Sequence, residues 1–205
     1  MKRILLLGDA ASAIYHPLPQ VEPGLRQAVD GLGALDVRTD YHAMTCGTLR
    51  DYDLVISYID TFPEMGTFEM ELARYIRGGG RVLALHNGII TPEEGPLAQC
   101  YGGVFLTHPE YQPLRYCVEP RNGWLELEDF VMPEEPYMVR QLDRENHVFL
   151  SFLLEGAAYP AGWVRRAEQG TVLYLAPGHD ARTAGNPVFI RLLRLCAAHL
   201  LELQN

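Results

Sequence analysis

The chain has 205 residues, of which 48% are hydrophobic and 21% are charged, and its formal net charge is −9 at pH 7. This length and balance predict one soluble domain, spanning residues 1–205, with a sizeable buried core. The negative charge repels phosphate backbones and anionic lipids, and no apolar run approaches the roughly 18 residues that cross a bilayer. We therefore expect neither nucleic acid nor a membrane as a partner.

Residue usage excludes several common enzyme classes. Lys2 is the only lysine and opens the first apolar run, which excludes a pocket lysine for Schiff-base chemistry. No GxxxxGK, GxSxG or GxGxxG motif is present, so the signatures of P-loop enzymes, α/β-hydrolases and dinucleotide-binding enzymes are missing. The four cysteines lie far apart with no CxxC pair, which favours reduced thiols in a cytoplasmic protein.

The first half of the chain alternates strand and helix patterns. Strand-like runs cover residues 4–7, 37–41, 53–58 and 81–85. The first is continuously apolar, the second alternates weakly, and the last two contain the apolar segments 54–56 and 82–85. Apolar residues recur at helical spacing over 19–32 and 68–76, and the second helix is predicted to stop at Gly78-Gly79-Gly80. Continuous apolar strands separated by helices are typical of a parallel sheet covered on both faces.

The second half begins with a different pattern. Short strand-like runs at 115–118, 137–142 and 148–152 are interrupted by proline and glycine, so we expect an irregular or antiparallel elaboration within 104–166. A strand at 171–175 and a final helix starting at Asn186-Pro187 then resume the first pattern. The predicted fold class is α/β, with a doubly wound, mostly parallel sheet and this elaboration in the middle of the chain.

Polar side chains follow several of the predicted strands. Ligands of open parallel sheets bind beyond the carboxyl ends of the strands. The residues that the strands bring to this edge are His16, Asp60, His86, Asn87, His179 and Asp180. The irregular middle adds His108 and the pair Glu134-Glu135. Because imidazole suits proton transfer and metal ligation near neutral pH, this edge is the predicted functional site.

Structural roles remain alternatives for some of these residues. A loop histidine such as His16 can simply be solvated, Asp60 can cap the following helix, and Glu134 and Glu135 can be surface charges. The sequence requires no cofactor. Three histidines and a carboxylate suit zinc or manganese, and the ligand set would be His86, His108, Glu135 and His179. A metal-free acid–base site fits the same residues, and no short metal-ligand motif decides between the two.

Six segments of the chain, taken in order, carry a resemblance to a known family. They read DYDLVI (51–56), GGRVLALH (79–86), YGGVFLTHP (101–109), EEPY (134–137), PAGW (160–163) and GTVLYLAPGHD (170–180). Together they resemble the ThuA-like (trehalose-utilisation) family, which shares a flavodoxin-like fold with class I glutamine amidotransferases. The resemblance covers nearly the whole chain and implies a role in carbohydrate metabolism.

The resemblance also implies a site. His86 stands at the elbow where glutamine amidotransferases carry their nucleophilic cysteine, and Cys100 follows too late to replace it, so thiolate glutaminase chemistry is not expected. The residues predicted to be catalytic are His86, His179, Glu135 and His108. The residues predicted to contact substrate are His16, Asp60, Asn87, Tyr137 and Asp180.

Two departures from the family pattern affect the substrate pocket. The family has Asp-Glu where this chain has Glu134-Glu135, and its His-Pro-Ile-like segment is missing from Val118–Phe130. The leading functional hypothesis is an enzyme, a hydrolase, lyase or isomerase, that acts on a disaccharide, glycoside or keto-sugar without a nicotinamide cofactor. The alternative is a non-catalytic sugar-binding or regulatory protein on the same fold. A homodimer is compatible with this fold, although periodicity identifies no interface.

Overall fold

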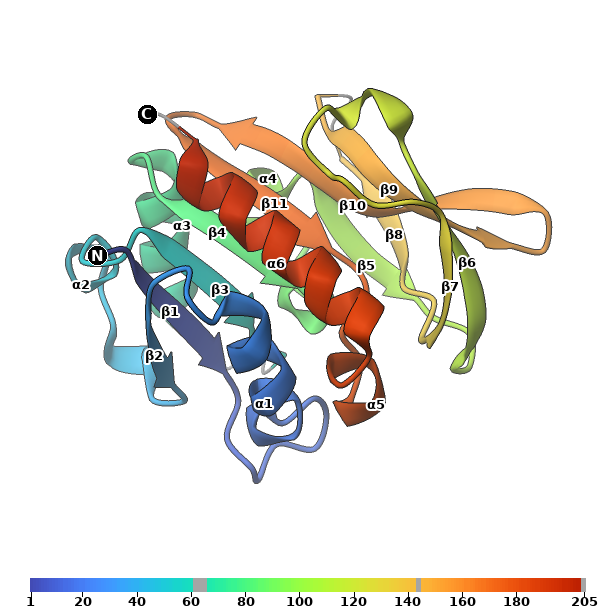
Figure 1. Ribbon diagram of the computed structural model, residues 1–205. Coiled ribbons are helices and arrows are strands. Elements are labelled where there is room, and N and C mark those ends of the chain that lie inside the picture. The colour runs from blue at the N-terminus through green and yellow to red at the C-terminus, as the bar shows by residue number, and fades with distance from the viewer. Residues whose placement is uncertain (61–65, 143–144, 204–205) are drawn as a thin grey trace.

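A nine-stranded mixed sheet forms the centre of the molecule (Figure 1). The computed structural model describes residues 1–60, 66–142 and 145–203. In spatial order the strands are β2 (Ala34–Arg38), β1 (Arg3–Gly8), β3 (Leu54–Tyr58), β4 (Arg81–Leu85), β11 (Gly170–Leu175), β10 (Ala157–Ala167), β9 (His147–Leu154), β6 (Gln112–Val118) and β7 (Phe130–Glu134). A separate two-stranded sheet consists of β5 (Gly103–Thr107) and β8 (Met138–Gln141).

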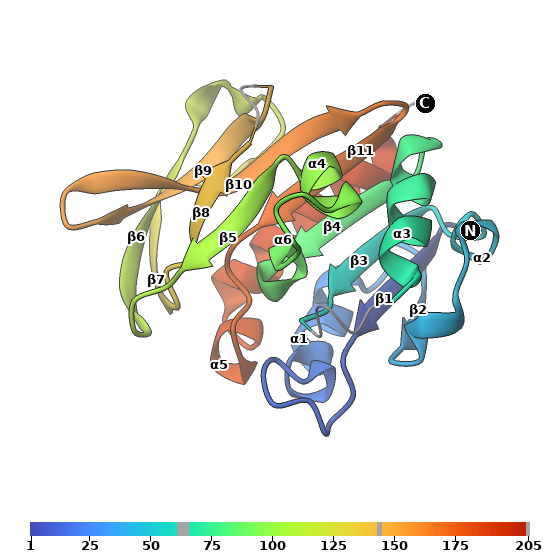
Figure 2. The same ribbon diagram turned by 180° about the vertical axis from the view of Figure 1, so that it is seen from behind.

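The first five strands in this order pair in parallel, and helices cover both of their faces. The helices are α1 (Leu18–Val29), α2 (Cys46–Leu49), α3 (Phe68–Arg77), α4 (Pro96–Tyr101), α5 (Ala181–Ala184) and α6 (Pro187–Glu202). Helices α1 and α6 lie on one face and α3 and α4 on the other (Figures 1 and 2). Every residue of β3 and β11 is buried, as the continuous apolar runs predict. No helix within the described residues is long and apolar enough to span a membrane.

The remaining four strands extend the sheet in antiparallel fashion. Beyond β11 the sheet contains β10, β9, β6 and β7, in that spatial order. Each of these strands pairs antiparallel with the strand before it. The expected antiparallel elaboration in the middle of the chain is therefore present, but it is larger than the sequence indicated. Four of the eight described pairings in the large sheet are parallel, so the sheet is mixed, and its parallel half is the part that the continuous apolar runs predict.

Several elements differ from the sequence-based expectations. β2 ends at Arg38, so the strand predicted at 37–41 lies several residues earlier in the chain. Strands β5, β7 and β10 were not predicted. β10 contains Pro160 and Gly162, which weaken a strand pattern, and its pairing with β9 shifts register at these two residues. The small sheet of β5 and β8 packs beside β10 (Figure 2), and residues of the site described below lie in the segments next to its two strands.

A close approach of α1 to α5 requires glycine at position 24. A Cβ there would stand 2.0 Å from the backbone oxygen of Ala184. Gly24→Ala must separate the two helices, and we expect it to lower the free energy of unfolding by about 1–3 kcal/mol in urea titrations. Gly47→Ala in α2 is the matched control, because a Cβ there lies 3.4 Å from its nearest neighbour, Thr45 Oγ1. The control should change stability by less than about 0.5 kcal/mol, and equal effects of the two variants would contradict this account.

Candidate active site

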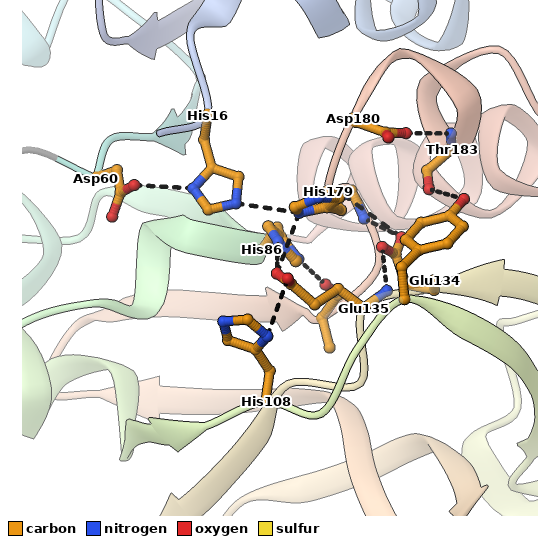
Figure 3. Close-up of polar contacts among 12 residues, drawn as sticks. His16, Asp60, His86, His108, Glu134, Glu135, His179, Asp180 and Thr183 are labelled. Carbon is orange, nitrogen blue, oxygen red and sulfur yellow. Dashed lines mark hydrogen bonds and ion pairs between the residues drawn. The ribbon is translucent and has the colours of Figure 1, made fainter. Parts of the chain in front are cut away.

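The carboxyl ends of the parallel strands carry a cluster of histidines and carboxylates (Figure 3). His16 lies in the loop between β1 and α1, Asp60 follows β3, His86 follows β4 and His179 follows β11. His108 follows β5. The loop between β7 and β8 adds Glu135. The parallel sheet supplies four of these residues, and the irregular middle of the chain supplies the other two.

His86 is the most deeply buried member of the cluster, with 0% exposure. It begins the 3-10 turn η2 (His86–Ile89), and its φ of 48° lies in the left-handed region, which is strained for a residue with a side chain. The turn packs tightly on β3, because a Cβ at Gly88 would stand 2.3 Å from Ser57 O. The fold therefore holds the backbone of His86 in a conformation that residues with a side chain rarely adopt.

The protonation of His86 follows from its hydrogen bond. Its Nδ1 lies 2.6 Å from Ala176 O, and a carbonyl can only accept, so Nδ1 carries the proton. Burial lowers the pKa of His86 to about 4. Near neutral pH the ring is uncharged, and its Nε2 presents a lone pair 3.6 Å from Glu135 Oε2. The ring of Tyr137 packs on the imidazole at a centroid distance of 3.8 Å.

His16 reaches the cluster from the other side of the sheet edge. Its loop is closed by a bridge between Asp9 and Pro17, and its own φ is 46°. The side chain of Asp9 also accepts the backbone N–H of Asp60 at 2.7 Å, which fixes the segment after β3. In this arrangement His16 Nδ1 lies 2.8 Å from Asp60 Oδ2, and its Nε2 lies 3.2 Å from His179 Nδ1 (Figure 3).

Glu135 connects the remaining histidines. Its Oε1 lies 2.9 Å from His108 Nδ1, and its Oε2 lies 3.1 Å from His179 Nδ1. Burial opposes ionisation of this carboxyl, but the neighbouring His179 and His86 hold its pKa well below the usual range. Burial likewise favours neutral His179, yet Glu135 outweighs it and raises the pKa of His179. The cluster thus contains a carboxylate that stays charged, and His108 is its most exposed histidine, with 41% of the side chain accessible.

Glu134 has a different role from its neighbour. Its carboxylate accepts the backbone N–H groups of Glu135 and Gly178, each at 2.8 Å, and it is fully buried. Burial raises the pKa of Glu134 to about 7. The hydroxyl of Tyr58 donates to the backbone carbonyls of Gly178 and His179, at 2.9 and 3.0 Å, and so also fixes the loop after β11. These positioning roles of Glu134 and Tyr58 were not predicted from the sequence. Successive side chains of a strand point to opposite faces, and this alternation at the end of β7 is the signal that could have assigned Glu134 and Glu135 to different environments.

Two predicted substrate contacts lie apart from these interactions. Asp180 accepts the backbone N–H groups of Arg182 and Thr183 at 2.8 and 3.3 Å, so it caps α5 and points away from Glu135 (Figure 3). Asn87 follows His86 in η2 and is fully buried. The structure therefore brings together His16, Asp60, His86, His108, Glu135, Tyr137 and His179, and it gives Asp180 a local structural contact instead.

An open groove of about 950 Å³ lies elsewhere, along residues 118–130 and beside α6. Its lining contains Glu126, Glu128 and Asp129 but no histidine. It therefore lacks a group that titrates near neutral pH in its ordinary state. The histidine–carboxylate cluster, with its charged and neutral partners in contact, is the better candidate for an active site.

Solved structures with the same fold include proteins of two kinds. A ThuA-like protein from Bacteroides uniformis is 19% identical, with a TM-score of 0.78 over 97% of this chain and 91% of its own. A second from Parabacteroides merdae is 13% identical, with a TM-score of 0.76 over 98% and 90%. The β-galactosidase from Rahnella sp. R3 is 14% identical, with a TM-score of 0.69 over 98% of this chain but 31% of its own. At these identities the likeness shows the fold alone.

Sequence comparison is more specific. Among curated protein sequences, none matches this chain. The family model for trehalose utilisation matches residues 13–198, which is most of the chain and includes every member of the cluster. The chain belongs to the ThuA (trehalose utilisation) family.

Proposed function

We propose that this protein is an enzyme of carbohydrate metabolism that acts on a disaccharide, glycoside or keto-sugar at the histidine–carboxylate cluster. The observation that carries the proposal is the position of Glu135, whose two oxygens contact His108 and His179 in a family associated with trehalose utilisation. The parallel strands follow the order β2-β1-β3-β4-β11, which supports the finer interpretation of the fold as doubly wound and flavodoxin-like.

The chemistry that these residues support is proton transfer to and from a sugar. Glu135 and His108 form a hydrogen-bonded pair with one member open to solvent, which suits a general acid–base pair. Such a pair can remove a proton next to a keto group, or protonate the oxygen of a departing sugar. The Nδ1 of His179 contacts the other oxygen of Glu135 and holds the carboxylate in position. These roles fit a lyase, an isomerase or a hydrolase.

A conventional glycosidase with two catalytic carboxylates fits less well. Such enzymes need two carboxyl groups about 5–9.5 Å apart on either side of the scissile bond. Glu134 is the nearest second carboxylate in sequence, and both of its oxygens accept backbone N–H groups. Its position supports the loop that carries His179 and leaves Glu135 as the acid–base carboxylate of the proposed reaction.

A non-catalytic sugar-binding or regulatory protein is the second candidate. The observation that favours it is the residue at the elbow after β4, where His86 stands in place of a cysteine nucleophile. In this candidate the same pocket binds a sugar and releases it unchanged. Conversion of the bound sugar, as distinct from its affinity, separates the two candidates.

The first test is the melting temperature of the protein with trehalose, other disaccharides, glycosides and their keto derivatives. A ligand at 100 times its Kd adds about 2.7 kcal/mol, which is about 5–10 °C for a domain of this size. We expect a shift with at least one of these sugars, weakened in His86→Ala and retained in His147→Ala, whose residue is exposed at the start of β9. The bound sugar is then incubated with protein and analysed by mass spectrometry.

Each outcome of this test has a defined meaning. A shift with conversion supports the enzyme, and a shift without conversion supports the binding protein. If no sugar in the panel raises the melting temperature or is converted, both candidates are rejected.

A further inference from the structure

Four side chains of the cluster present one ligand atom each to a common point. The atoms come from His16, His86, Glu135 and His179, and all lie within 4.8 Å of one another. Consecutive separations are 3.2 Å for His16 Nε2 to His179 Nδ1, 3.1 Å for His179 Nδ1 to Glu135 Oε2, and 3.6 Å for Glu135 Oε2 to His86 Nε2. Ligands at bond lengths of about 2.0–2.1 Å around a tetrahedral metal ion lie about 3.3 Å apart. The three separations bracket that value.

The outer nitrogens of two of these histidines are already held. His86 Nδ1 donates to Ala176 O, and His16 Nδ1 contacts the carboxylate of Asp60. Both contacts fix the tautomer in which the proton sits on Nδ1 and the lone pair sits on Nε2, toward the common point. Metal-binding histidines typically have such an arrangement, with a carbonyl or carboxylate behind the ring.

The lone pair of His86 lacks a hydrogen-bond partner among the described residues. Its Nε2 is completely buried, makes no hydrogen bond and faces the carboxylate oxygen Oε2 of Glu135. Two electron-rich atoms that face each other in a buried site repel, and the desolvation of His86 Nε2 is uncompensated. A cation between them removes both penalties.

We propose that His16, His86, Glu135 and His179 bind one divalent transition-metal ion, with zinc favoured by this imidazole-rich set. The proposal deepens the proposed function, because it uses the same site. It also departs from the ligand set that the sequence suggested, since His16 replaces His108. The Nδ1 of His108 contacts the other oxygen of Glu135, so His108 stays outside the metal shell as a proton-exchange group.

The test is direct metal binding by the full chain, with activity as an independent measurement. Chelator-treated protein is titrated with ZnCl₂ and separately with MnCl₂ against a chromophoric competitor, and the bound metal is counted by mass spectrometry. We expect one zinc per chain. His86→Gln and Glu135→Gln should weaken zinc affinity by about 100-fold or more, and Asp60→Asn, which loosens the support of His16, by about 10–100-fold. Cobalt(II) bound in place of zinc should give the visible absorption of a tetrahedral site.

Two variants serve as controls. His147→Gln changes an exposed histidine outside the cluster, and His108→Gln changes the histidine that contacts Glu135 without entering the proposed shell. Both should keep the zinc stoichiometry. His147→Gln should keep an affinity within about threefold of wild type. His108→Gln removes a contact of Glu135 and should weaken affinity by about 10-fold, well short of the loss in Glu135→Gln. Circular dichroism of each variant confirms that it is folded, and Asp60→Asn keeps the test available if His86→Gln does not fold.

The outcomes also separate this proposal from the proposed function. Wild-type protein that binds less than one-tenth of an equivalent of zinc and manganese, or folded Glu135→Gln and Asp60→Asn proteins that bind zinc as wild type does, would overturn the metal site. Conversion of a sugar by such metal-free protein would leave the enzyme proposal standing. Stoichiometric zinc in a protein that neither binds nor converts any sugar would support the metal site and reject the function.

Discussion

Replacing Glu135 by glutamine is expected to lower kcat/KM for the converted sugar by about a thousandfold, within the range for loss of a general acid–base group. The carboxylate contacts His108 through one oxygen and His179 through the other, and glutamine keeps the shape but removes the charge and the proton affinity. The measurement is steady-state kinetics on the sugar identified by the thermal-shift panel. Because glutamine is nearly isosteric, the variant should remain folded, with a far-ultraviolet circular dichroism spectrum like that of wild type.

The matched control for this variant is Glu128→Gln, which removes a carboxylate from an exposed position outside the cluster. It should change kcat/KM by less than about twofold, because salt screens the effect of an exposed charge outside the cluster on the groups within it. If Glu135→Gln is folded and retains a tenth or more of the wild-type kcat/KM, Glu135 has no part in proton transfer and the proposed mechanism is wrong.

Replacing His108 by glutamine is expected to lower kcat by about 10²-fold or more. Its imidazole combines access to solvent with a 2.9 Å contact to Glu135, so its loss removes proton exchange and leaves the buried part of the cluster intact. KM should change much less than kcat, because the effect falls on the chemical step. Steady-state kinetics of His108→Gln, with His147→Gln as the control, measure this split.

The result also separates the two roles assigned to the histidines. His108→Gln that keeps the zinc stoichiometry but turns over slowly matches a proton-exchange group outside the metal shell. A variant with an unchanged kcat would show that His108 is a surface residue that happens to contact Glu135.

The sequence alone determined the parallel half of the fold. Runs such as Ile4–Leu7 and Val82–Leu85 are apolar without interruption, a pattern that satisfies burial on both faces and needs no information from elsewhere in the chain. The start of α6 is equally local, since Asn186 Oδ1 accepts the backbone N–H of Val188 and Pro187 occupies the first turn. Once strands and helices alternate, the edge that carries His86 and His179 follows from the topology of parallel sheets.

The antiparallel half was harder to predict because its signals are weak and its partners are distant. β10 is the longest strand described, yet Pro160 and Gly162 break the alternation that would mark it. β5 and β8 pair across about thirty residues of chain, and this pairing together with that of β6 and β7 positions the segments that carry His108 and Glu135. A local pattern contains no information on such a register.

The candidate site shows the same division. Residue type and strand ends identified His16, Asp60, His86 and His179 from sequence, because side chains that follow parallel strands reach this edge. His108 and Glu135 come from the irregular middle of the chain, and the family resemblance gave them their predicted roles. The tertiary structure decided which of them meet. His16 and His179 are separated by 163 positions, and their nitrogens lie 3.2 Å apart because the loop after β1 is closed at Asp9 and Pro17. The tertiary structure also places Asp180 at the start of α5 and leaves His108 at the surface. The distances between these side chains depend on long-range packing, which no short segment of sequence encodes.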